Sequence, residues 1–256
     1  MTHRIATIAR YTVLEAVRTR LPLLTLAAML IVLGASFFIR EIAIAESARF
    51  QTAFYAAAMR FAIVFIAALY VVASIAREFQ DKGLDVALAL DLPRSHYIVG
   101  KLAGFLVIGL ALALAVALPM IPLVGVEAVA AWSLSLALEL AVVVAFSLFC
   151  AVTFNQLMPA LAVVMAFYLF ARALTAVRLI GANPIAGAQN LSHKVMTWIV
   201  ESLALVIPAL EGWTRTSWLV DAAPAWPALP QIGVHSALFV AIVAAAAVFD
   251  MHRKNF

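Results

Sequence analysis

Charged side chains in this sequence are concentrated between Arg77 and Lys101. Eight of the 17 basic and 13 acidic residues fall in this stretch, although the chain is 66% hydrophobic and only 12% charged. They are Arg77, Glu78, Asp81, Lys82, Asp85, Asp91, Arg94 and Lys101. The apolar run Leu84–Leu92 and Pro93 lie among them. Charges of both signs around an apolar stripe are suited to docking against a soluble partner protein, because they offer both complementary ion pairs and apolar contact.

A second candidate is the pair Glu139 and Arg172, which lies inside two long apolar runs, about Ala131–Thr153 and Met158–Ile180. A charge at the centre of a bilayer costs at least about 2.5–3.5 kcal/mol, so such residues are paired or functional. If both runs are helices, each residue lies about 12 Å from the outer end of its run. We therefore predict an ion pair that holds the two helices together, and we favour this role over contact with a transported substrate.

The composition excludes an ordinary soluble domain, because a mean hydropathy of +1.09 leaves too few polar atoms to cover a water-facing surface. A single cysteine, Cys150, excludes a disulfide within the chain, and five histidines without ligand spacing predict no metal site. The formal charge of +4 is small and indicates membrane topology rather than affinity for nucleic acid.

Six apolar runs have about the length needed to cross a hydrocarbon layer about 30 Å thick. Barrel strands would alternate between polar and apolar residues, whereas these runs are apolar on every side. We therefore predict an all-α integral membrane protein with one transmembrane domain, residues 1–256. The predicted spans are about Leu21–Ile39, Ala56–Ala76, Gly100–Val124, Ala131–Thr153, Met158–Ile180 and Ile232–Phe249.

Single residues refine this plan of the spans. Pro119 and Pro122 are expected to break the third span near its end, because proline lacks the backbone N–H. The spacing Gly100-x-x-x-Gly104 would let another helix approach the third span closely. Arg60 and Arg178, near outer span ends, are expected to extend toward the outer headgroups.

The distribution of lysine and arginine favours cytoplasmic termini, because ten of the 17 basic residues then lie on the cytoplasmic side. Residues 1–20 mix basic and apolar positions at imperfect helical spacing and predict an interfacial helix, with a plain topology anchor as the alternative. In that helix Glu15 and Arg18 can pair, because they are three residues apart. Residues 21–180 would then hold spans one to five, and residues 232–256 the sixth span and a cytoplasmic tail.

Residues 181–231 are predicted to form an extracytoplasmic segment before the sixth span. Within Ser192–Leu210 the apolar residues keep helical spacing, which predicts an amphipathic helix that lies on the surface or is re-entrant. A seventh span is the alternative. The loop that follows is rich in tryptophan and proline and suits the lipid headgroup level.

The connection between the second and third spans, residues 77–99, is predicted to contain a short cytoplasmic helix. Its apolar residues alternate, which alone favours a strand, but an isolated strand at a membrane surface has no partner edge. Good helix formers precede Pro93, which ends the helix. Asp85 and Asp91 are then expected on its exposed side.

This connection resembles the region between the second and third spans of ABC-2-type transporter permeases. That family's pattern is an acidic residue, a glycine or threonine, an apolar helix, a proline, an arginine and a Gly-Lys pair. The corresponding residues here are Glu78, Gly83, Leu84–Leu92, Pro93, Arg94 and Gly100-Lys101. The segment Ile8–Leu24 is also similar to the family's N-terminal connecting helix, and the number of spans and the basic C-terminal tail agree.

The resemblance implies an exporter in the bacterial inner membrane, with two permease chains, identical or different, above two copies of an ABC ATPase. An extracytoplasmic accessory protein would be a further partner. ATP and Mg would be bound by the ATPase, and no cofactor is expected in this chain because it lacks the G-x-x-x-x-G-K-[ST] motif. The residues expected to dock the ATPase are Asp85, Leu88, Asp91 and Arg94. Those expected to brace the docking region are Glu15, Arg18, Glu78 and Lys101.

Other classes of function fit less of the sequence. A secondary transporter is expected to have broken spans or inverted repeats, and only the third span is interrupted. An intramembrane enzyme needs convergent catalytic groups, and no such motif is present. A non-transporting membrane assembly factor stays open, because its soluble partner could use the same docking segment. The apolar spans do not identify the transported substrate.

Overall fold

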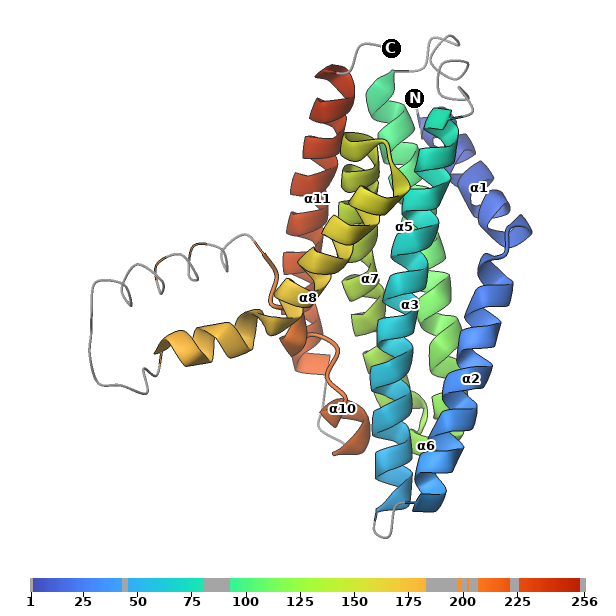
Figure 1. Cartoon of the computed structure of the whole chain (residues 1–256), viewed down its shortest axis with the longest axis vertical. Coiled ribbons are helices and arrows are strands. Elements are labelled where there is room, and N and C mark those ends of the chain that lie inside the picture. The colour runs from blue at the N-terminus through green and yellow to red at the C-terminus, as the bar shows by residue number, and fades with distance from the viewer. Residues whose placement is uncertain are drawn as a thin grey trace.

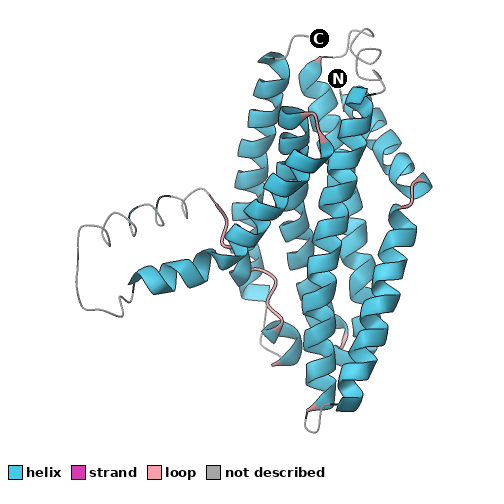
Figure 2. Cartoon of the chain, viewed as in Figure 1, coloured by secondary structure: helices cyan, strands magenta, loops and turns pink. Residues whose placement is uncertain are grey.

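In the computed structural model the described residues lie almost entirely in helices (Figure 2). None of the residues that it describes lies in a β-strand, so the all-α prediction is confirmed for that part of the chain. The described residues are 2–42, 46–80, 93–182, 198, 202, 207–221 and 226–253.

Within this part of the chain, six helices are long and apolar enough to cross a membrane. Helices form there because, without water, the backbone N–H and C=O groups can only be satisfied within the segment. Each helix coincides with one of the six predicted spans. They are α2 (Leu21–Ile42), α3 (Ser47–Gln80), α5 (Arg94–Ala117), α7 (Val126–Phe154), α8 (Leu157–Ala182) and α11 (Leu229–Arg253).

The six long helices run up and down one bundle (Figure 1). The start of α1 (Thr2–Arg18), the end of α3, the start of α5 and the end of α11 all lie at one end of it, which we call the termini end. The end of α2 and the start of α3 lie at the opposite end, and the last part of α8 projects sideways from the bundle. The predicted outer helix over Ser192–Leu210 and its alternative, a seventh span, fall almost entirely outside the described residues.

Proline and glycine shape the connection between α5 and α7. The regular helix α5 ends at Ala117, and a 3-10 turn and the short helix α6 (Ile121–Val124) follow it, each with a proline near its start, Pro119 and Pro122. The predicted late break in the third span is therefore confirmed. Gly125 then reverses the chain with a positive φ of 99°, a conformation that glycine adopts without a Cβ penalty.

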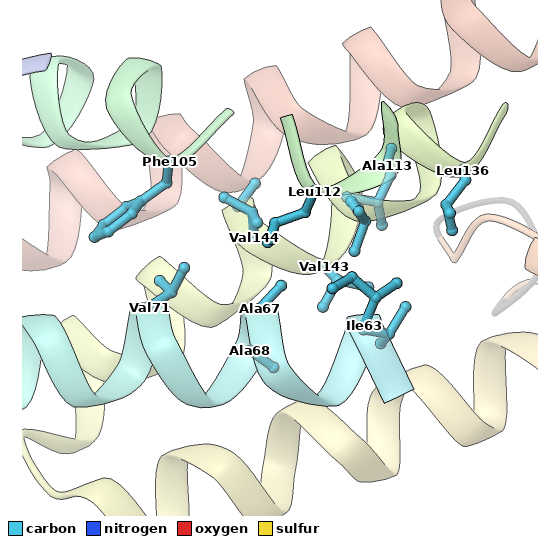
Figure 3. Packing of buried hydrophobic residues seen from close by; sticks show 14 of the residues in the cluster. Ile63, Ala67, Ala68, Val71, Phe105, Leu112, Ala113, Leu136, Val143 and Val144 are labelled. Carbon is cyan, nitrogen blue, oxygen red and sulfur yellow. The ribbon is translucent and has the colours of Figure 1, made fainter. Parts of the chain in front are cut away.

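The core of the bundle lies where α3, α5 and α7 pack together (Figure 3). Ile63 and Ala67 of α3, Phe105 and Leu112 of α5 and Val143 of α7 are among the buried side chains there. The apolar window of α7 is 67% buried, whereas that of α2 is only 11% buried. Helix α7 is thus the central helix, and α2 lies at the periphery with most of its apolar surface free to face lipid.

Two glycines allow α1 to pack closely on α5. A Cβ atom at Gly104 would lie 2.7 Å from the Thr12 Cβ atom and 2.9 Å from the Ala9 carbonyl oxygen. A Cβ atom at Gly100 would lie 2.8 Å from the Ile8 Cβ atom. The close approach predicted from Gly100-x-x-x-Gly104 is confirmed, and the helix that approaches is α1.

We expect Gly104→Ala to destabilise the protein by about 1–3 kcal/mol, because the new methyl group must displace α1 from α5. The measurement is the melting temperature of the purified chain in a neutral detergent. The matched control is Gly34→Ala on α2, where no atom lies within 4 Å of the new Cβ atom. The control should be neutral or slightly stabilising because alanine favours helix. Equal melting temperatures for both variants would contradict the close packing.

Candidate functional site

Three helices, α1, α3 and α5, meet at the termini end. Helix α3 ends there at Gln80, α5 begins there at Arg94, and α1 packs along α5 (Figure 1). Residues 81–92, which join α3 to α5, lie outside the described residues. The predicted docking residues in that range are Asp85, Leu88 and Asp91. Among the described residues, the site therefore consists of the end of α3, the start of α5, and α1.

An ion pair between Glu78 of α3 and Lys101 of α5 links the two flanking helices directly. The Tyr97 hydroxyl, also on α5, donates a hydrogen bond to the other carboxylate oxygen of Glu78. The Lys101 side chain is only 8% exposed, and its ammonium group lies 5.9 Å from the centre of the Phe105 ring. Both oxygens of Glu78 are thus engaged by α5.

Glu15 connects α1 to the same two helices. One of its carboxylate oxygens accepts a hydrogen bond of 3.0 Å from Ser74 and lies 3.5 Å from the Arg77 guanidinium, both on α3. The other lies 3.6 Å from the Lys101 ammonium group on α5. Lys101 therefore lies between two carboxylates from different helices, and α1, α3 and α5 form one charge network.

Helical spacing brings these residues onto common faces. Ser74 and Glu78 are four residues apart on α3, with Arg77 between them, and Tyr97 and Lys101 are four residues apart on α5. Residues three or four apart lie on the same side of a helix. The prediction named Glu15, Glu78 and Lys101 but gave no role in the network to Ser74, Arg77 or Tyr97, although this spacing was readable from the sequence.

The network is balanced in charge, because two carboxylates, Glu15 and Glu78, meet two bases, Lys101 and Arg77. An ammonium group as buried as that of Lys101 loses most of its hydration, and only nearby carboxylates compensate for that loss. Removal of one partner would leave the other charge desolvated and unpaired. The network can therefore hold α1, the end of α3 and the start of α5 in fixed positions relative to one another. This role is mechanical, because it involves no chemical reaction.

Arg94 and Arg18, the other described residues that were predicted for docking and bracing, lie outside this charge network. Arg94 donates hydrogen bonds of 2.9 Å and 3.3 Å to the carbonyl oxygens of Met251 and His252 at the end of α11. A guanidinium at a helix C-terminus satisfies free carbonyls and complements the helix dipole. Arg18 is exposed and forms no ion pair with any described residue, so the expected bracing by Arg18 and its pairing with Glu15 are not found.

The predicted intramembrane pair is present in the structure. An Arg172 guanidinium nitrogen on α8 lies 3.2 Å from a carboxylate oxygen of Glu139 on α7, and Glu139 is fully buried. The same carboxylate oxygen accepts a hydrogen bond of 3.0 Å from the buried Tyr168 hydroxyl. Arg172 also donates to the Leu210 carbonyl oxygen at 3.4 Å. The pair therefore links α7, α8 and the segment that precedes α11.

Arg60 belongs to the same region, and our prediction that it extends to the outer headgroups is wrong. Its guanidinium instead donates to the Thr214 carbonyl oxygen within the protein and interacts electrostatically with Glu139. Ser135 binds the neighbouring carbonyl oxygen of Trp213 at 2.8 Å. Arg60 and Glu139 lie equally many residues after the observed starts of α3 and α7, but the predicted span starts, Ala56 and Ala131, did not place them at equal depth.

Among the described residues, no group of three or more histidine, cysteine, aspartate or glutamate side chains could hold a metal ion. Comparison of the sequence with models of known protein families gave no match, and no curated protein matched it either.

We expect Lys101→Met to destabilise the protein by about 3 kcal/mol, because it leaves the Glu78 and Glu15 carboxylates without their shared partner. Arg77→Met is the matched control. Its side chain is 53% exposed, so its loss should cost no more than about 1 kcal/mol. Thermal unfolding in detergent measures both variants. Adding Glu78→Gln to Lys101→Met should recover part of the loss, and a Lys101→Met variant as stable as the control would refute the network's role.

Proposed function

We propose that this chain is the membrane-spanning permease subunit of an ATP-binding-cassette exporter. The observation that carries the proposal is the charge network of Glu15, Glu78 and Lys101, which ties α1, α3 and α5 together around the connection 81–92. The resemblance of residues 77–101 to the coupling region of ABC-2-type permeases supports the same function. So do six apolar helices of membrane-spanning length.

A coupling helix works only if its displacement reaches the membrane helices. The 34-residue helix α3 and the 24-residue helix α5 are continuous from the flanks of 81–92 into the bundle core. The Glu78–Lys101 pair would make both helix ends move together, and Glu15 would carry α1 with them. Rigid-body movement of packed elements is one of the known ways in which a change at one site is transmitted through a protein.

Arg94 would extend this linkage to the last span. In the proposed assembly it was expected to dock the ATPase, but it also holds the C-terminal carbonyls of α11. Movement at the start of α5 would then also displace the end of α11. In this function Asp85, Leu88 and Asp91 would supply most of the docking surface, and Arg94 would join it to the bundle.

The complete transporter would contain two permease chains, either identical or different, and two ATPase subunits that bind ATP and Mg. The termini end of the bundle would face the cytoplasm of a bacterial cell, with the bilayer around the six spans. An accessory protein could bind at the opposite end. The alternatives, a secondary transporter or a membrane assembly factor, would require no ATP hydrolysis by a docked subunit.

The test is reconstitution of the chain with candidate ABC ATPases and measurement of co-purification and ATP turnover. We expect Asp85→Lys with Asp91→Lys to weaken docking about tenfold, because charge reversal opposes the partner's complementary surface. Glu127→Lys, an exposed acidic residue near the start of α7, is the control and should change neither quantity. Unchanged docking and turnover in the double variant would favour the alternatives.

A further inference from the structure

A buried polar cluster lies within the bundle, away from the network at the termini end. It consists of Arg60 of α3, Glu139 of α7, and Tyr168 and Arg172 of α8. Arg60 and Arg172 both donate to backbone carbonyls of residues that precede α11 in the chain: Arg60 to that of Thr214, in a bend, and Arg172 to that of Leu210, in a single 3-10 turn. Irregular backbone at membrane depth is tolerated where it is buried in protein or lines a cavity. The cluster thus lies where the bundle departs from simple helix packing.

The charges of this cluster do not balance. Two guanidinium groups meet one carboxylate, and that carboxylate is paired with Arg172 and Tyr168 through a single oxygen. Arg60 interacts electrostatically with Glu139 and Tyr168 but lies within ion-pair distance of no described carboxylate, and its Nε atom is buried without a hydrogen-bond partner. The described residues therefore leave about one positive charge without a counter-ion among apolar helices, which is unfavourable unless an anion is bound.

The geometry of the Arg60 guanidinium, whose Nε–H has no partner, indicates the kind of anion. A guanidinium offers five N–H donors in a fixed plane, a geometry that matches the oxygen atoms of a phosphate group. Arg60 and Arg172 are both partly exposed, so a ligand can reach them. Phosphate is also the oxyanion that membrane lipids carry. We propose that the buried polar cluster binds a phosphate group, with Arg60 as the main ligand and Arg172 as the second.

Glu139 gives this site a distinctive property. Its second carboxylate oxygen is fully buried and has no partner, so a negative charge stays next to the proposed anion. That charge acts as an internal competitor, because like charges at short range repel. Its removal should therefore tighten phosphate binding, whereas removal of Arg60 should weaken it. A purely structural role for these residues predicts no such opposite effects on a ligand.

The site does not depend on the proposed exporter function, since binding can be measured on the chain alone. The assay is the ligand-dependent shift in melting temperature of the purified chain in a neutral detergent. The probes are short-chain phosphatidylglycerol, inorganic phosphate, and a diacylglycerol with the same acyl chains. Stabilisation by phosphatidylglycerol but not by diacylglycerol is the expected result. Equal stabilisation by inorganic phosphate would identify free phosphate, rather than a lipid headgroup, as sufficient.

The variants separate this site from non-specific attraction to charge. Arg60→Gln should weaken binding about tenfold, and Glu139→Gln should strengthen it. Arg40→Gln, on an exposed position of α2, should leave binding unchanged. If Arg60→Gln does not fold, Arg60→Lys keeps the charge without the planar fork and should bind with intermediate strength. The absence of stabilisation by either phosphate probe, or weaker binding in Glu139→Gln, would overturn the proposal.

Discussion

A charge inside an apolar bundle must have a partner, and this constraint determines how the polar residues of this protein are arranged. Lys101 is the clearest case, because its nearly buried ammonium group is paired with two carboxylates, those of Glu78 and Glu15, on two other helices. The desolvation cost of such a group is compensated only while all three helices keep their positions. The pairing therefore does more than add stability, because it fixes the relative placement of the helices that carry the charges.

Apolar packing alone would not fix that placement. Lipid tails are as apolar as leucine side chains, so helices in a bilayer gain little from hiding apolar surface from one another. Close backbone approach and polar contacts have to supply the specificity. Gly100 and Gly104 allow that approach between α5 and α1, and the charge network lies beside the same contact. Helix α2 has neither a close backbone contact nor a polar contact at its exposed face, and it lies at the edge of the bundle.

The protein contains two polar centres of different character. The network at the termini end is balanced, tightly paired and adjacent to the connection 81–92, which suits the transmission of movement. The cluster around Arg60 and Glu139 has an excess of positive charge among its described residues and donates to the backbone carbonyls of Leu210 and Thr214, which suits recognition of a ligand. Helix α3 carries residues of both centres, so it is the element through which movement at one could affect the other.

The sequence by itself determined the helical class, the six spans, the break at Pro119 and the pairing of Glu139 with Arg172. These follow from local rules, because length and composition decide insertion, proline removes a donor, and a buried charge needs a partner. Only the tertiary structure decided that α1 is the helix packed on the two glycines, that Glu15 contacts Lys101 rather than Arg18, that Arg94 caps α11 and that Arg60 stays within the protein. Such choices depend on which faces of distant helices meet, and the rotation of one apolar helix against another leaves almost no trace in its own sequence.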